Sequence, residues 1–230
     1  MLEILYEDNH IIAVNKKASD IVQGDKTGDR PLPEYVKDYI KKKYNKPGDV
    51  FLGIVHRLDR PVSGVVLFAR TSKALSRLNE MFREKKIQKT YWAIVKNKPK
   101  NKIDILVHYL LKNQAKNKSQ AFNREDKNTL RSELRYELIH SLDNYHLLEV
   151  SPKTGRHHQI RVQLAKIGCP IKGDIKYGFD RTNMDKSIHL HARKINFVHP
   201  VKKKPISITA PTPNDVVWKS CETIEDRHLL

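Results

Sequence analysis

A short polar segment between two apolar stretches holds the residues best suited to chemistry. Residues 56–64 read HRLDRPVSG, so two cations, the carboxylate of Asp59 and a hydroxyl fall within one short segment. Pro61, Ser63 and Gly64 are typical of a tight turn, and a turn at a strand end presents a side chain on a rigid scaffold. Asp59 is therefore a candidate nucleophile. The alternative is a solvated turn with a surface Arg–Asp pair, which contributes little.

A second segment, SPKTGRHHQIRVQLAKIG at 151–168, combines a turn with a basic helix. The turn at Thr154-Gly155 is expected to open the helix, where backbone N–H groups attract phosphate. Arg161 flanks the apolar stripe of this helix, so its guanidinium is expected to face a cleft while its stem is buried. A partly buried Arg requires a carboxylate, and Asp59 is the natural candidate. This pairing would keep Asp59 ionised and oriented. The alternative is a basic helix that only meets solvent.

Tyr91 lies in KTYWAIV at 89–95, a stretch that predicts a buried strand. In one interpretation the Tyr91 side chain completes the packing of the core. In the other its ring lies beneath a nucleobase, with its hydroxyl close enough to exchange a proton.

The histidines suggest a metal site only weakly. His189 and His191 form a possible chelating pair, but no cysteine or acidic residue completes a zinc set. The HxE…PCxxC order of nucleobase deaminases is missing. A hydrolase built on Ser63 has no GxSxG elbow to support it. We therefore expect no metal.

The elements that position these residues are mostly short strands. Periodicity predicts helices over 31–44, over 73–85 with Ser72 as N-cap, and over 157–167. Strands are expected at 3–6, 11–15, 52–55, 64–70, 89–95, 130–139, 145–150, 194–198 and 205–209. Many strands and few helices favour an α+β fold on a mixed, mostly antiparallel sheet. The regular βα alternation of a Rossmann fold is absent.

With 230 residues, 39% of them hydrophobic, the chain can bury one core, whole or split into two lobes. We expect one domain over 1–220, with a lysine-rich excursion at 96–128 that forms a protruding hairpin or loop. Residues 221–230 read as a polar C-terminal tail.

The charge balance indicates the partner. Lys and Arg number 44 against 26 Asp and Glu, a net charge of +18, and the sequence pI is about 9.8. Such basicity favours a nucleic acid over a membrane as the binding partner. The alternative is a lysine-rich surface that serves only solubility. No apolar run approaches the 18 or so residues of a spanning helix. Two cysteines without CxxC spacing fit a reducing cytoplasm.

Taken together and in order, these motifs resemble the RluA-type family of pseudouridine synthases. The resemblance rests on HRLD with the following SG, on the Tyr of KTYWAIV, and on TGRHHQIRVQLAKIG followed by PIKGDIKYG. LHARKINFVHP and PISITAPTP extend it, so that it covers about residues 3 to 212. It implies a mixed, mostly antiparallel sheet with flanking helices and a central cleft.

The resemblance also implies a function. The chain would isomerise uridine to pseudouridine in structured RNA, ribosomal or transfer, after base flipping and with no cofactor. Asp59 corresponds to the catalytic aspartate, Arg57 to the arginine that helps evict the uridine, Tyr91 to the active-site tyrosine and Arg161 to the basic partner of the aspartate. His56, Arg156 and His158 are expected to contact RNA.

The sequence departs from the family pattern in three places. Val62 replaces a frequent Thr, and His157 replaces a frequent Thr or Ser. The small amino-terminal S4 domain of many relatives is not in this sequence, so residues 96–128 and Lys202-Lys203-Lys204 are expected to grip the substrate. A monomer in the cytoplasm is expected. The rival interpretations are a non-catalytic RNA-binding or RNA-folding protein of this fold, and a basic nuclease that uses histidines.

Overall fold

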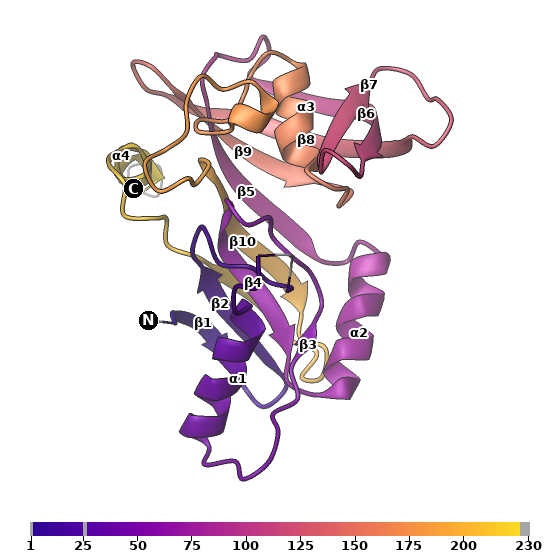
Figure 1. Cartoon of the computed structure of the whole chain (residues 1–230), viewed down its shortest axis with the longest axis vertical. Coiled ribbons are helices and arrows are strands. Elements are labelled where there is room, and N and C mark those ends of the chain that lie inside the picture. The colour runs from indigo at the N-terminus through magenta and orange to yellow at the C-terminus, as the bar shows by residue number, and fades with distance from the viewer. Residues whose placement is uncertain (1, 25–26, 226–230) are drawn as a thin grey trace. The chain divides into compact units, whose positions relative to one another are not determined.

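The computed structural model describes residues 2–24 and 27–225, and side-chain burial as far as residue 222. These residues form eleven strands, most of them antiparallel to their neighbours, with four α-helices (Figure 1). The α+β class predicted from the sequence is confirmed. The chain divides into two compact units, each with its own core. Unit 1 comprises the described residues of Met1–Lys89 and Ala192–Pro213, and unit 2 those of Thr90–His191 and Asn214–Leu230.

Unit 1 is built on β4, whose residues are all buried. Its neighbours are β2 and β10, with β1, β3 and β11 at the periphery. The strands are β1 (Ile4–Glu7), β2 (Ile11–Lys16), β3 (Gly53–Ile54), β4 (Ser63–Ala69), β10 (Leu190–Val198) and β11 (Pro205–Thr209). The first two residues of β10 belong to unit 2. The opening β1–β2 hairpin was predicted, and the Asp8 carboxylate closes its turn by accepting from the N–H groups of His10 and Ile11.

Two amphipathic helices belong to unit 1. Helix α1 (Leu32–Lys43) has proline at its first turn, where no N–H is needed, and buries Val36 and Ile40 one turn apart. Helix α2 (Ser72–Arg83) buries Leu78. Its N-cap is Thr71 rather than the predicted Ser72, because the Thr71 hydroxyl accepts the N–H of Ala74. Both helices were predicted within two residues.

Unit 2 contains antiparallel strands in the order β5, β9, β8, β6, β7. Its strands are β5 (Gln88–Val95), β6 (Ile103–Asn113), β7 (Lys118–Phe122), β8 (Leu130–Ser141) and β9 (His146–Pro152). The excursion predicted at 96–128 contains the β6–β7 hairpin, in which Leu110 pairs with Ala121. One face of this hairpin packs on α3 (Gln159–Lys166) through Val162. A short 3-10 turn, η1 (Ile175–Tyr177), completes this cluster.

The carboxyl-terminal residues are a correction to the sequence prediction. Residues 221–225 do not form a tail but continue helix α4 (Val216–Glu225). Trp218 and Cys221, three residues apart on this helix, are buried against Trp92 and Ile94. Residues 226–230, which were also assigned to the tail, lie outside the described residues. Among the described residues, no helix is both long and apolar enough to cross a membrane.

Candidate active site

Asp59 lies in the turn that leads into β4 and is half-buried. The N–H of Val62 donates to the Asp59 carbonyl at 3.0 Å, which closes a turn over Arg60 and Pro61. A second backbone bond runs from the N–H of Ser19 to the Arg60 carbonyl at 3.0 Å. The carboxylate is thus carried on a turn whose main chain is fixed at two points.

A buried lysine that the sequence analysis missed supports this turn. Lys16 ends β2 and is 0% exposed. Its ammonium donates to the carbonyl oxygens of Lys17 at 3.0 Å, Arg60 at 3.1 Å and Val62 at 2.6 Å. Hydrogen bonds from a charged donor are stronger than neutral ones. Two of the three accepting carbonyls follow Asp59 within three residues, so Lys16 holds the main chain that presents the carboxylate.

The charge on Lys16 is shaped by its surroundings. Burial lowers the pKa of the Lys16 ammonium to about 8, while the carboxylates of Asp20 and Asp59 oppose that shift. The two carboxylates therefore favour the charged form of Lys16. A lysine at the end of a strand is usually exposed to solvent, so the sequence alone gave no indication that Lys16 is buried and supports the turn.

Gly64 explains why the motif requires glycine. Its φ is +114°, a conformation that side chains rarely adopt. A Cβ at this position would lie 2.4 Å from the carbonyl oxygen of Ala192 on the neighbouring strand β10. The turn ends where two backbones approach each other too closely for any side chain.

His56 and Arg57 precede Asp59 and have different surroundings. The Nε2 of His56 accepts the N–H of Leu67 at 2.9 Å, and its ring stacks on Phe82 with centroids 5.2 Å apart. Burial lowers the pKa of His56 to about 3. His56 is therefore a neutral anchor of the segment, whereas its predicted RNA contact stays a prediction. Arg57 is exposed and donates to the Gln23 side chain at 2.5 Å, so its guanidinium is accessible for the predicted role.

Arg161 in unit 2 has a carboxylate partner that the sequence analysis did not name. Its Nε and Nη2 donate to the two oxygens of Asp174 at 2.7 and 2.9 Å, and both side chains are buried. The guanidinium also lies over the ring of Tyr177 at 5.1 Å. The bidentate geometry fixes the plane of the guanidinium. Asp59 belongs to the other unit, and its pairing with Arg161 stays a prediction.

Tyr91 lies on β5 opposite Val150 of β9 and is half-buried. Successive side chains of a strand point to opposite faces. Trp92 and Ile94 are buried in the cluster with Trp218, so Tyr91 faces the other side of the sheet and is not part of that core.

The turn before α3 differs from the predicted phosphate site. The helix begins at Gln159 rather than 157, because His158 adopts a left-handed conformation with φ of +53°. The N–H of Arg156 is not available to a phosphate, since it donates to the Gln159 side chain at 3.0 Å. The His158 ring is buried and hydrogen-bonds to the Tyr177 hydroxyl at 2.8 Å, which leaves little surface for the predicted RNA contact. The Arg156 side chain is exposed, as an RNA contact requires.

The histidine pair weighed as a chelate has other partners. His189 hydrogen-bonds to Asp215 at 3.0 Å and stacks on Trp218, and His191 lies against the same ring. In the described parts of the chain, no three His, Cys, Asp or Glu side chains are placed to share a metal ion.

Comparison with known proteins identifies the family. The profile of the RNA pseudouridylate synthase family matches residues 10–166. The chain belongs to this family. It is 36% identical to the ribosomal large subunit pseudouridine synthase C of Vibrio vulnificus, over 90% of this chain and 65% of that protein. It therefore spans slightly less than two thirds of that relative's length.

A second relative matches along nearly its whole length. The tRNA pseudouridine synthase C of Haemophilus influenzae is 34% identical, over 91% of this chain and 92% of that protein. Among solved structures, human RNA pseudouridylate synthase domain containing 4 shares the fold with a TM-score of 0.78 and 23% identity, over 94% of this chain and 90% of that chain.

Proposed function

We propose that this chain isomerises uridine to pseudouridine in RNA, with Asp59 as the catalytic carboxylate. The observation that carries the proposal is the HRLDRPVSG turn, which lies inside the family match and whose backbone is held by the buried ammonium of Lys16. The names of the relatives include ribosomal and transfer RNA enzymes, so both RNA classes are proposed substrates.

The reaction sets what the site must do. The bond between N1 of uracil and C1′ of ribose breaks, the base turns, C5 bonds to C1′, and the proton on C5 leaves while N1 gains one. No electrons are exchanged with another molecule, so the atoms balance without an oxidant or reductant. Asp59 can add to the base ring, attack C1′, or remove a ribose proton to give a glycal. Each route requires an ionised and oriented carboxylate.

The neighbouring residues have separate proposed tasks. The target must leave its stack, which costs a few kcal/mol, and we propose that the exposed Arg57 fills the gap. Tyr91 faces away from the Trp92 core and is proposed to stack beneath the detached uracil. We propose that Arg161, its plane fixed by Asp174, orients the Asp59 carboxylate.

The test is Asp59→Asn, assayed by tritium release from RNA labelled at C5 of uridine. The label leaves only when C5 bonds to ribose. We expect the variant to bind RNA like the wild type and to release no tritium above background. Asp20→Asn is the matched control, because Asp20 is also half-buried and also acts on Lys16. Release by Asp59→Asn at the wild-type rate contradicts the proposal.

The rival interpretation is tested in the same assay. Wild-type protein that binds RNA but releases no tritium from any RNA would favour the non-catalytic RNA-binding protein. Strand cleavage would favour the nuclease.

The basic surface gives a second, independent test. Each phosphate contact to a single strand is expected to lower the slope of log affinity against log salt by about 0.7. Affinity that does not change with salt contradicts a role for the +18 net charge.

We further propose that the protein acts as a monomer in the cytoplasm. The two cysteines support a reducing compartment, because both are free and buried. Sedimentation and cell fractionation test the two statements.

A further inference from the structure

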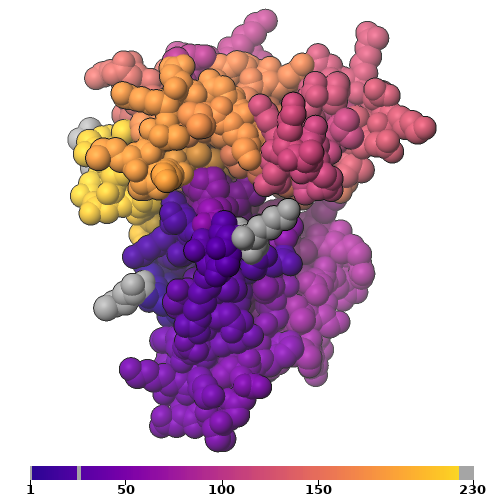
Figure 2. All heavy atoms as spheres, in the orientation of Figure 1, coloured from indigo at the N-terminus to yellow at the C-terminus, as the bar shows by residue number. Residues whose placement is uncertain are grey.

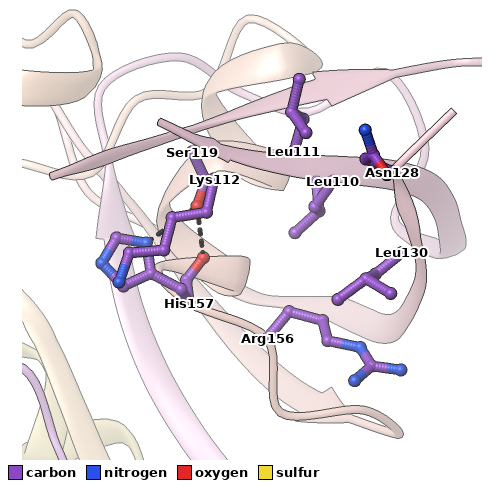
Figure 3. Close-up of a pocket in the computed structure, with 8 residues that line it drawn as sticks. All are labelled: Leu110, Leu111, Lys112, Ser119, Asn128, Leu130, Arg156 and His157. Atoms are coloured by element: carbon purple, nitrogen blue, oxygen red, sulfur yellow. Dashed lines mark hydrogen bonds between the residues drawn. The ribbon is translucent and has the colours of Figure 1, made fainter. Parts of the chain in front are cut away.

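Unit 2 contains a pocket that the proposed catalytic residues do not use. It lies where the end of β6, the start of β7, the start of β8 and the turn before α3 meet (Figure 3). Its volume is about 330 Å³. The residues that line it are Leu110, Leu111, Lys112, Ser119, Asn128, Leu130, Arg156 and His157. Ligand pockets span about 300–1,000 Å³, so this one suits a small group such as a single nucleotide.

Leucines form the apolar part of the pocket. Leu110 is buried, but Leu111 is 37% exposed and Leu130 is 51% exposed. Figure 3 shows Leu110 and Leu130 on the same side of the pocket, with Lys112 and His157 across from them. Apolar surface beside a concave site is typical of ligand binding, and a flat nucleobase can cover such surface while its edges remain in water.

The polar part of the pocket is cationic. None of the eight residues is acidic, and Lys112 and Arg156 are both exposed. Among the described residues, neither side chain has an ion-pair or hydrogen-bond partner. The Arg156 guanidinium lies on the Leu130 side of the pocket (Figure 3), where a cation beside apolar surface matches a phosphate attached to a base. Proteins bind single-stranded RNA by combining contacts to bases with contacts to the backbone.

Hydrogen bonds hold one wall of the pocket in place. The Ser119 hydroxyl lies 2.8 Å from the carbonyl oxygen and 2.8 Å from the Nδ1 of His157, and the Nε2 of His157 lies 3.0 Å from the Asn117 oxygen. The N–H of Ser119 also donates to the Tyr177 hydroxyl at 2.8 Å. These bonds tie the β6–β7 hairpin to the turn before α3 and to η1, so less ordering is needed when a ligand binds.

We propose that this pocket binds one unpaired nucleotide of the RNA substrate, separate from the target uridine. The base lies on Leu110 and Leu130, and the Arg156 guanidinium binds the phosphate. The inference rests on RNA being the substrate of the proposed function, and it adds where on the chain a second nucleotide is held. Because its ligand is a base with a phosphate, the pocket favours RNA in which an unpaired nucleotide accompanies the target.

The experiment measures binding of a fluorescein-labelled, single-stranded decauridylate by anisotropy. Leu130→Asp places a like charge beside the phosphate, and Arg156→Gln removes one cation. Both side chains are exposed, so the fold is expected to persist. We expect each variant to bind about tenfold more weakly, because the first repels the phosphate and the second loses a contact to it.

Two control variants match these changes in kind. Ile105→Asp alters a residue of β6 that is 58% exposed and does not line the pocket. Arg131→Gln removes a cation that pairs with Glu133 instead. We expect both to bind within twofold of the wild type. Equal losses in the controls and the pocket variants would overturn the proposal, because they would indicate a diffuse charge effect.

Cross-linking locates the nucleotide directly. A decauridylate containing 4-thiouridine, irradiated on the wild-type protein, is expected to attach within 110–130 or at 156–157, as mass spectrometry of the peptides would show. Cross-links that all lie elsewhere overturn the proposal. Competition with polyglutamate is a second check. If polyglutamate displaces the labelled oligonucleotide as effectively as unlabelled decauridylate, the proposal is overturned, because an acidic peptide would then fit the site.

The outcomes separate this inference from the proposed function. Pocket variants that bind decauridylate like the wild type, while the wild type releases tritium, disprove the pocket and leave the function. Cross-links in the pocket with no tritium release from any RNA support the pocket and disprove the function. In turnover assays we expect Leu130→Asp to raise KM about tenfold and leave kcat within twofold.

Discussion

The two charged groups proposed to act together are held in different ways. Asp59 is half-buried, and its turn is fixed through main-chain carbonyls that accept bonds from Lys16. Arg161 is 5% exposed, and its own guanidinium is bound by Asp174 and covered by Tyr177. When hydrogen bonds hold only the backbone of a residue, its side chain stays able to contact a reactant. When hydrogen bonds hold the side chain itself, that side chain is fixed in one orientation. This difference suits the proposed roles, in which Asp59 reacts and Arg161 orients it.

The comparison predicts that Arg161 matters first for stability. Arg161→Met leaves the Asp174 carboxylate buried without its partner, which costs about 3–5 kcal/mol of unfolding free energy. The double variant Arg161→Met/Asp174→Leu removes the stranded charge and is expected to recover most of that loss in urea unfolding. It is not expected to recover tritium release. Full activity in the double variant would show that Arg161 serves the fold alone.

On the Asp59 side, the largest effect is expected at the end of the turn. Gly64→Ala forces an unfavourable φ and a contact with the Ala192 backbone, so we expect a loss of about 2–4 kcal/mol in unfolding free energy. Gly48→Ala is the control, because a Cβ there meets nothing within 4 Å. If the two variants are equally stable, the close approach of β4 and β10 is not a constraint.

Backbone support of Asp59 is tested at Lys16. Lys16→Met removes three hydrogen bonds and one buried charge, so the stability losses and gains partly offset. We expect a fall in kcat of about tenfold, or about 1.4 kcal/mol in the barrier, with KM unchanged. The neighbouring exposed Lys17→Met serves as control. A Lys16→Met enzyme with wild-type kcat would remove Lys16 from the positioning of Asp59.

The last prediction concerns the anchor before the turn, and its effect on stability appears only below neutral pH. The pKa of His56 is about 3 in the folded protein, against 6.5 for an unperturbed histidine. The unfolded chain therefore binds a proton between these pH values that the folded chain does not. Stability is fully present above pH 6.5 and falls by about 1.4 kcal/mol for each pH unit below it.

The control for that titration is His56→Gln, whose side-chain oxygen can still accept the N–H of Leu67. We expect the slope of unfolding free energy against pH, measured between pH 4.5 and 6.5, to be shallower in the variant. Identical slopes would show that His56 titrates alike in both states.

Local patterns predicted the elements that carry the site. The apolar stretches on either side of Asp59 and the helical periodicity around Leu78 are encoded by neighbouring residues, and both appear in the structure. What the sequence could not supply were contacts between distant segments. Lys16 and Asp174 read as ordinary charged residues until the fold buried them beside Arg60 and Arg161.

The two misplaced boundaries have the same cause. The start of α3 was predicted two residues too early, because no neighbouring residue indicates the left-handed conformation of His158. The ring of His158 is held by the Tyr177 hydroxyl, nineteen positions later in the sequence. The end of the chain read as polar because the buried Trp218 and Cys221 of α4 stand among polar residues, and their partner Trp92 lies far away in the sequence.

The most direct test of the central claim is a map of pseudouridine at single-nucleotide resolution. Total RNA is compared from cells with this gene, without it, and with the Asp59→Asn allele in its place. We predict that at least one pseudouridine disappears on deletion and is restored by the wild-type gene but not by Asp59→Asn. Identical maps with and without the gene, or restoration by Asp59→Asn, would contradict the account.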